Sequence, residues 1–494
     1  MRCLRAMRVL FRLSMPLLLP FLLAGAHRPA TTVPATCANA PARLAYTLQV
    51  DPHSATLLVR GRLDGSFCGP VRFRHPTRLG PYALRLLTEV TFRDARGPRK
   101  AAPDGPGSWV LTDIHGPLFF SYRVRTDPKA HDLPDGNVWR SVMPYVDAAR
   151  LYLTRYAFML PDNVTIYPSI RLTWYVPEGW TLVTPWQNGT TTVDVPGLYA
   201  LLKNYYAAFR GGDVRRHHLG TTDVTLAWTG PGTISEATEQ AMLRVVRTLL
   251  DLEPGGFGPH LTFLLHDTAR EGHLTGGTAG ISSIQLQFPH DVPLERIWPY
   301  AGGVVLRTMA HEMIHTWTYA REQSVAPSAS LPAAWDDSVC WLREGVTEYL
   351  AHQALLDAGL LDTDALALEL EHTARRARQH DRSGSLTLAD ACTRYYEDTD
   401  AFYYTYYEGM VFAFRLDAEL RRFSEGRKSL RGFMQAFIPP RRGETKDLED
   451  FLTAWRAYAP PEVADVASLL TRPGGTDPHP YLTRPARSLA HAGR

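Results

Sequence analysis

The chain has 494 residues, of which 45% are hydrophobic and 21% are charged, and its formal net charge is +3. This length suggests two or three domains, and the composition is that of a soluble globular protein. The small net charge, without a basic stripe interleaved with aromatic residues, gives no reason to expect a nucleic-acid partner.

The first 26 residues have the pattern of a signal peptide. A basic start precedes the apolar run Leu13–Leu23, and the small residues Ala24, Gly25 and Ala26 then offer a cleavage site. The run is shorter than the ~20 residues that a membrane-spanning helix needs; an uncleaved signal anchor is the alternative. We therefore expect an exported protein, periplasmic or secreted, with no stable membrane insertion after the signal is removed.

Residues 27–42 are rich in Ala, Pro and Thr, which predicts a linker. Four cysteines remain once Cys3 leaves with the signal, and an even number in an exported protein permits two disulfides. Proximity in the sequence favours Cys37–Cys68 and Cys340–Cys392, although three connectivities are possible. Four buried thiols are the alternative.

Short strand-like runs separated by Pro and Gly turns fill residues 43–230, with examples at 56–59, 172–176 and 224–228. This spacing predicts a β-sandwich-like N-terminal domain. A helix is then predicted from Thr233, with Glu236 completing a capping box, followed by strands at 261–265 and 281–288. Helices dominate afterwards, at 303–320, 340–358, 363–378, 404–423, 428–437 and 446–458. The Pro-, Gly-, His- and Arg-rich residues 473–494 predict a disordered tail.

The strongest chemical signal is the pentapeptide His311-Glu312-Met313-Ile314-His315. Residues four apart lie on one face of a helix, so both imidazoles can reach the same metal ion. Glu312 would lie near the open coordination position, where it can take a proton from a water whose pKa the metal lowers. The apolar periodicity around the motif indicates a buried helix, in which unpartnered histidines would be costly. A chance match is the alternative.

Because a catalytic zinc site takes three protein ligands, a third is needed, and Glu344 is the best candidate. Glu348 lies four residues further on the same predicted helix face. It could orient a ligand imidazole, or it could be an ordinary surface charge. The tyrosines in residues 402–407 could donate a hydrogen bond to an oxyanion, with aromatic packing as the alternative.

Three segments in this order, HEMIHTW, WLREGVTEYL and YYEGMVFAFRLDAELRRFSEGRKSL, resemble the gluzincin zinc metallopeptidases. The glycyl aminopeptidase family, whose members often carry a PDZ domain, is the most similar, and the aminopeptidase N family is more distantly similar. The resemblance covers about residues 44 to 460, and the 28 residues between His315 and Glu344 fit it. It implies a multidomain α+β fold with a β-rich domain to residue 230, a thermolysin-like zinc peptidase domain at 231–360 and a helical region at 361–472.

Transferred to this chain, the resemblance implies one zinc ion bound by His311, His315 and Glu344. Glu312 would be the general base and would later protonate the leaving amine. Tyr406, three residues before a glycine, would stabilise the transition state, with Tyr407 as the alternative if the register slips by one.

The sequence departs from the family at its glycine-rich segment, residues 276–283. No carboxylate occurs where relatives hold the free amino end of the substrate, and Glu271 is a weak substitute. An endopeptidase therefore competes with an aminopeptidase, although the glycines could still let a peptide backbone approach an edge strand. We also expect no PDZ domain.

The function predicted is zinc-dependent hydrolysis of a peptide or protein substrate. One alternative is a binding protein that keeps the peptidase fold without turnover. The other is a metal hydrolase of a non-peptide substrate, which a metal site alone does not exclude.

Overall fold

The computed structural model describes residues 42–75, 86–126, 143–186, 190–252, 256–269, 276–289, 292–323, 336–381, 383–395, 397–438 and 446–482. The predicted signal peptide, the predicted linker up to residue 41, Cys37 and Glu271 lie outside these ranges. None of the helices in the described ranges has both the length and the apolar character needed to cross a bilayer.

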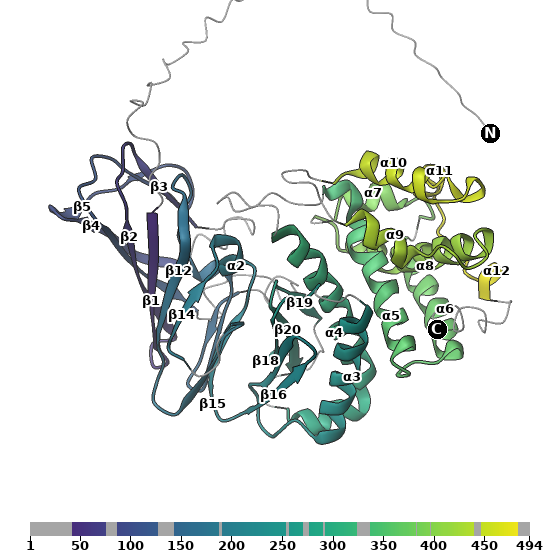
Figure 1. The fold of residues 1–494 in the computed structure, drawn as a ribbon, viewed down its shortest axis with the longest axis horizontal. Coiled ribbons are helices and arrows are strands. Elements are labelled where there is room, and N and C mark those ends of the chain that lie inside the picture. Colours follow the sequence, from purple (N-terminus) through teal and green to yellow (C-terminus); the bar gives the residue numbers. More distant parts are fainter. Residues whose placement is uncertain are drawn as a thin grey trace, which may run out of the picture. The chain divides into compact units, whose positions relative to one another are not determined.

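The N-terminal part of the described chain is built from three β-sheets (Figure 1). The largest has the order β14-β12-β1-β2-β8-β4-β5, and its strands are β1 (Ala42–Asp51), β2 (Thr56–Asp64), β4 (Leu87–Asp94), β5 (Gly97–Arg99), β8 (Leu118–Arg125), β12 (Ile166–Tyr175) and β14 (Thr192–Val195). Alternate residues of β1 are buried, as in a sheet with one face on a core.

Two four-stranded sheets complete this part and share its apolar core. Their strands are β9 (Tyr145–Val146), β10 (Arg150–Leu153), β13 (Trp180–Val183) and β15 (Tyr206–Arg210) in one, and β3 (Val71–Arg74), β6 (Ala102–Pro103), β7 (Ser108–Leu111) and β11 (Leu160–Pro161) in the other. A short helix, α2 (Leu198–Leu202), packs against the same core.

A separate five-stranded sheet carries the second part, in the order β16-β17-β18-β20-β19. Its strands are β16 (Asp213–Leu219), β17 (Thr222–Trp228), β18 (His260–Ala269), β19 (Gly277–Ala279) and β20 (Ser283–Pro289). β17, β18 and β20 are parallel, and β19 is an antiparallel edge strand. The domain boundary predicted at residue 230 is therefore too late, because β16 and β17 pair into this sheet. A strand pattern does not say which sheet the strand joins.

Two helices accompany this sheet: α3 (Glu236–Leu252) lies between β17 and β18 in the chain, and α4 (Leu294–Gln323) follows β20. α3 begins later than predicted, because the Ser235 hydroxyl, not Thr233, accepts the N–H of Thr238. α4 begins nine residues before the predicted 303 and runs through Pro299, a residue that usually ends a helix. Leu294 and Ile297 in this early part are buried in the core, and this burial stabilises the extra turns.

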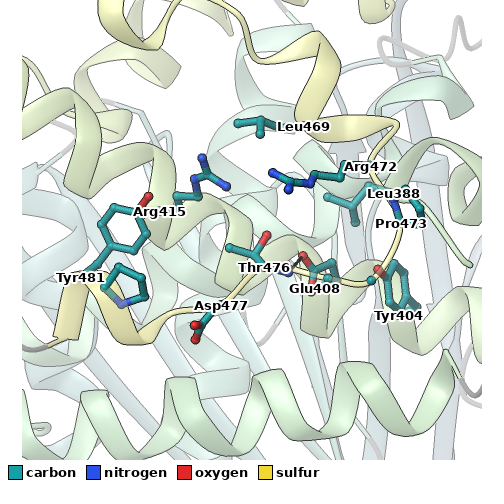
Figure 2. A pocket seen from close by; sticks show the side chains of 13 residues that line it. Leu388, Tyr404, Glu408, Arg415, Leu469, Arg472, Pro473, Thr476, Asp477 and Tyr481 are labelled. Atoms are coloured by element: carbon teal, nitrogen blue, oxygen red, sulfur yellow. Dashed lines mark hydrogen bonds between the residues drawn. The ribbon is translucent and has the colours of Figure 1, made fainter. Parts of the chain in front are cut away.

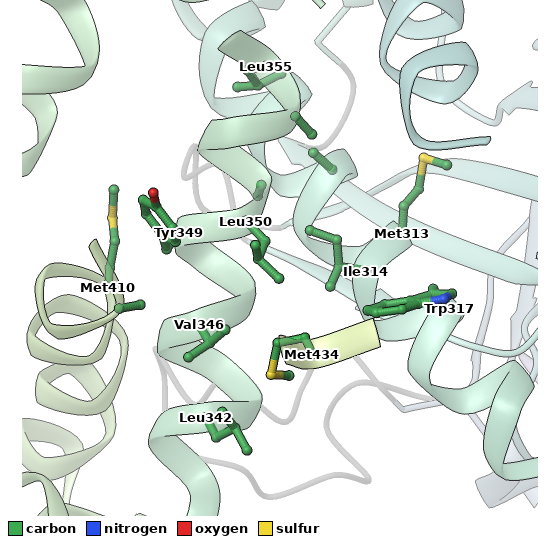
Figure 3. Close-up of a cluster of buried hydrophobic side chains, with 14 of the residues drawn as sticks. Met313, Ile314, Trp317, Leu342, Val346, Tyr349, Leu350, Leu355, Met410 and Met434 are labelled. Carbon is green, nitrogen blue, oxygen red and sulfur yellow. The ribbon is translucent and has the colours of Figure 1, made fainter. Parts of the chain in front are cut away.

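The C-terminal part is helical, and its helices are α5 (Thr347–Asp357), α6 (Thr363–His380), α7 (Leu388–Thr393), α8 (Thr399–Phe423), α9 (Leu430–Phe437), α10 (Leu448–Tyr458), α11 (Ala467–Leu470) and α12 (His479–Leu482). One apolar cluster joins them to the five-stranded sheet. Figure 3 shows side chains of α4, α8 and α9 around the helix that carries Leu342, Val346 and Leu350. A small separate cluster links the two parts of the chain, with Tyr152 and Phe209 on one side and Ala227 and Leu264 on the other.

One favoured disulfide is present, between Cys340 and Cys392. Cys68 is also disulfide-bonded. The first part of the predicted tail, residues 473–482, is ordered against α8. There the N–H of Thr476 donates to Glu408, and the Tyr481 hydroxyl donates to Glu419. These hydrogen bonds hold residues 473–482 against α8, which the composition of the segment alone did not predict.

Candidate metal centre

The two motif histidines lie one turn apart on α4 and are both buried. Their Nε2 atoms are 3.0 Å apart, and the rings meet edge to face at 4.7 Å between centroids. The i, i+4 spacing thus turns both imidazoles toward one point, as the sequence predicts.

The third candidate ligand comes from the next helical segment. Glu344 is buried, and its Oε2 lies 3.2 Å from Nε2 of His315 and 3.6 Å from Nε2 of His311. The ligand atoms of the three residues all lie within 4.8 Å of one another. Glu344 sits in a π-helical turn, Leu342–Val346, immediately before α5. Such turns occur often at functional sites, because the inserted residue changes the direction of its side chains.

Two contacts fix the position of this turn. α8 crosses it at Gly345 and Gly409, so closely that a Cβ atom on Gly345 would lie 2.4 Å from the Cα of Gly409. In addition, Nε of Arg343 lies 3.0 Å from the second oxygen of Glu344, and the Arg343 guanidinium stacks over the ring of Tyr395. The carboxylate is therefore held at both oxygens.

Glu348 orients one of the imidazoles. Its Oε2 lies 2.8 Å from Nδ1 of His311, while its Oε1 lies 3.2 Å from Nε of Arg307, which also pairs with Glu369. A carboxylate at Nδ1 keeps the proton on that nitrogen, so Nε2 is the atom of His311 that faces the other two ligand atoms and can bind a metal once it loses its proton. Of the two roles considered for Glu348, the structure places it where an orienting residue lies.

The surroundings favour positive charge between the three ligand atoms. Burial alone would lower the pKa of His311, but the hydrogen bonds to Glu344 and Glu348 raise it to about 10. Burial would raise the pKa of Glu348, yet the hydrogen bond from His311 and the charge of Arg307 lower it to about 2. Two imidazoles and one carboxylate form a donor set that suits zinc. The residues present therefore fit a divalent cation at this point.

Glu312 lies between the ligand cluster and the glycine-rich strand. A Cβ atom on Gly277 of β19 would lie 2.6 Å from Cγ of Glu312, so only glycine allows this close approach. The N–H of Ala279 donates to the Glu312 carboxylate. Burial, together with the charges of the nearby carboxylates, raises the pKa of Glu312 to about 8. A group of this pKa can accept a proton and release it again near neutral pH.

Tyr406 lies beside the cluster, and Tyr407 does not. The ring of Tyr406 stacks on His311 at 5.8 Å between centroids, and its hydroxyl is 3.4 Å from that of Tyr395. Burial and the charge of Glu344 raise the pKa of Tyr406 well above its ordinary range, so it keeps its proton as a donor. Tyr407 instead stacks on Tyr403.

Sequence reasoning missed Arg307 and Arg343. The spacing could have indicated Arg307, since it lies four residues before His311 and thus on the same face of α4. Arg343 precedes Glu344 directly, and neighbours in a helix ordinarily point in different directions. Nothing in the sequence marks the π-helical turn that lets the two side chains meet.

Known proteins resemble this chain in sequence and in fold. Residues 304–411 match the family model described as M61 glycyl aminopeptidase. The predicted resemblance is confirmed. Among solved structures, an aminopeptidase N family protein from Idiomarina loihiensis is similar in fold, with a TM-score of 0.64 and 16% identity, over 83% of this chain and 75% of that chain. No curated protein matches the sequence. The multidomain α+β fold is thus aminopeptidase-like, and the family match supports peptide hydrolysis.

Proposed function

We propose that this protein is a zinc metallopeptidase in which His311, His315 and Glu344 hold one zinc ion per chain. The observation that carries the proposal is the convergence of their three ligand atoms within 4.8 Å, from two separate helical segments. Glu312 and Tyr406 flank this point, which is the arrangement that a water-activating hydrolase needs. The match to a peptidase family over residues 304–411 supports a peptide substrate.

The bound ion would supply Lewis acidity, which polarises a carbonyl group and acidifies water. Glu312 would take the proton from the attacking water and later give it to the leaving amine. Its buried position beside β19 keeps the carboxylate away from bulk solvent. Tyr406 would donate its hydroxyl hydrogen to the oxyanion of the tetrahedral transition state.

The edge strand β19 supports an extended peptide as the substrate. β19 is the last strand of its sheet and packs against α4, the helix that carries Glu312. A peptide added to such an edge would hydrogen-bond through its backbone. The proposal includes both aminopeptidase and endopeptidase action, because the glycine-rich segment contains no carboxylate that could pair with a substrate ammonium.

Replacing Glu312 with Gln tests the proposed chemistry. The variant should keep one zinc per chain and lose peptidase activity by about a hundredfold or more, because a general base contributes ~10²–10⁴-fold. Glu344→Ala should instead lose zinc during dialysis against a weak chelator. Peptides with free and with blocked N-termini, assayed side by side, separate an aminopeptidase from an endopeptidase. Full activity in Glu312→Gln would reject the mechanism.

We also propose export, to the periplasm or the medium, on the strength of the basic and apolar pattern of residues 1–26. The mass of the mature protein from its native host tests this. Removal of the segment ending at Ala26 is expected, and an intact N-terminus on a cytoplasmic protein would reject it.

A further inference from the structure

A cavity lies on the side of α8 that faces away from the metal cluster. Tyr406 and Glu408 are two residues apart on this helix, about 200° around its axis, so their side chains leave it on nearly opposite faces. Glu408 lines a cavity of about 400 Å³ between α8 and residues 469–481 (Figure 2). This volume falls in the range of small-molecule sites.

Two arginines lie at one end of the cavity, whose lining also includes Asp477. Arg415 and Arg472 turn their guanidinium groups toward one another above Thr476 (Figure 2). Glu419 orients Arg415 through its Oε1, which lies 3.0 Å from Nε, whereas Arg472 forms no ion pair within the described residues. Two facing guanidinium groups offer N–H donors to an anion that lies between them. A carboxylate matches their donors best, because it can accept two parallel hydrogen bonds.

The other end carries a buried carboxylate. Glu408 is 4% exposed, and the N–H of Thr476 donates to it at 2.6 Å. A Cβ atom on Gly475 would lie 3.1 Å from Oε2 of Glu408, so the glycine lets residues 474–476 lie directly on the carboxylate. No ion pair of the described residues includes Glu408, and burial raises its pKa to about 7. A ligand ammonium would stabilise the ionised form.

The separation of the two ends indicates the length of the ligand. Glu408 and Arg415 are seven residues apart on α8, which places their Cα atoms on one face and about 10.5 Å apart along the axis. An extended dipeptide spans about 7 Å, and a hydrogen bond of about 2.9 Å extends each end. Backbone positions this far apart favour a ligand of about this length over a single amino acid, and Leu388 and Leu469, which also line the cavity, can contact an apolar side chain.

We infer that this cavity binds a short peptide of about two residues with both ends free, its ammonium at Glu408 and its carboxylate at Arg415 and Arg472. The inference does not depend on the proposed peptidase activity, because none of these residues touches the metal cluster. It concerns binding only.

The test is a calorimetric titration of the full chain with alanyl-leucine, in the Glu312→Gln background to prevent hydrolysis. Arg472→Ala and Glu408→Gln should each weaken binding at least tenfold. Arg427→Ala, which removes an exposed arginine paired with Glu425, is the matched control and should change nothing. Binding at the metal centre would be insensitive to all three changes. Unchanged affinity in Arg472→Ala would therefore overturn the inference, even if Glu408→Gln failed to fold.

Dipeptides that are blocked at one end give a second test of the inference. N-acetyl-alanyl-leucine should bind weakly and equally in the parent and in Glu408→Gln, while the C-terminal amide should be insensitive to Arg472→Ala. Inorganic phosphate serves as the simple anion. If phosphate binds through Arg472 while alanyl-leucine does not bind, the cavity is an anion site and the inference is wrong.

Discussion

Glu348 acts on the metal site without being a proposed ligand, since it accepts the hydrogen bond from Nδ1 of His311. Residues in this position typically contribute 10–100-fold to metal affinity. We therefore expect Glu348→Gln to weaken zinc binding by about that factor. Competition for zinc with a chromogenic chelator would measure the affinity of the variant. Glu369→Gln is the matched control, because Glu369 also contacts Arg307 but not an imidazole. Equal affinities in the two variants would contradict this role.

The raised pKa of His311 gives zinc binding a pH dependence. With a pKa of about 10, His311 carries two protons at pH 7.5 in the absence of metal. Zinc needs the Nε2 lone pair, so binding must displace a proton. Apparent affinity should therefore rise with pH across the neutral range and level off only as the pH approaches 10. Calorimetric titration of the metal-free protein in buffers of different ionisation enthalpy should show release of about one proton or more. No net release would contradict the charge state assigned to His311.

At the same scale, sequence reasoning found the residues that belong to a motif. His311, Glu312, His315 and Glu344 follow from spacing on helices and from resemblance, and the structure brings the three ligand candidates together. Arg343 was not predicted, because neighbouring residues of a helix ordinarily point in different directions, whereas here the two side chains meet within a π-helical turn. Side chains that act through a local departure from regular geometry leave no periodic signal.

The helices that carry the site depend on one close crossing. At Gly345 a Cβ atom would meet the backbone of Gly409, which cannot move aside as a side chain can. Gly345→Ala should therefore force the π-helical turn away from α8 and cost about 1–3 kcal/mol of stability, as overpacking does. It should also weaken zinc binding, because Glu344 is the adjacent residue.

Gly303→Ala is the control for this change. Gly303 lies on α4 with open space around its Cβ position, so alanine there should be neutral or stabilise by about 0.4–1 kcal/mol. Urea unfolding of both variants and of the parent gives the comparison. A neutral Gly345→Ala would show that the crossing tolerates a methyl group.

Boundaries of elements were less predictable than their existence. The helices predicted at 363–378 and 446–458 correspond to α6 and α10, whose apolar faces are regular. α8 starts at Thr399, five residues before the predicted 404, because Asp398 caps it by accepting the N–H groups of Asp400 and Ala401. A cap is one side chain that makes local hydrogen bonds, and the spacing of apolar residues does not reveal it.

At the scale of the whole molecule, the described chain contains two large apolar cores. One belongs to the three N-terminal sheets, and the other runs from β17 through α11. The small cluster around Tyr152 and Leu264 connects them, and so do hydrogen bonds that join residues 204 and 205 to residues 282 and 283. The sequence predicted both regions but drew their boundary at residue 230, because alternating hydrophobicity marks a strand and not its partner.

This division should be visible when the protein is heated in a scanning calorimeter. Because the two apolar cores are separate, each can unfold on its own, so the heat-capacity trace should resolve into two peaks. Zinc at a hundredfold excess over its Kd should stabilise only the unit that contains His311, by about 2.7 kcal/mol. Chelation should therefore shift one peak downward and leave the other in place. A single peak that moves as a whole would show that the two cores unfold as one cooperative unit.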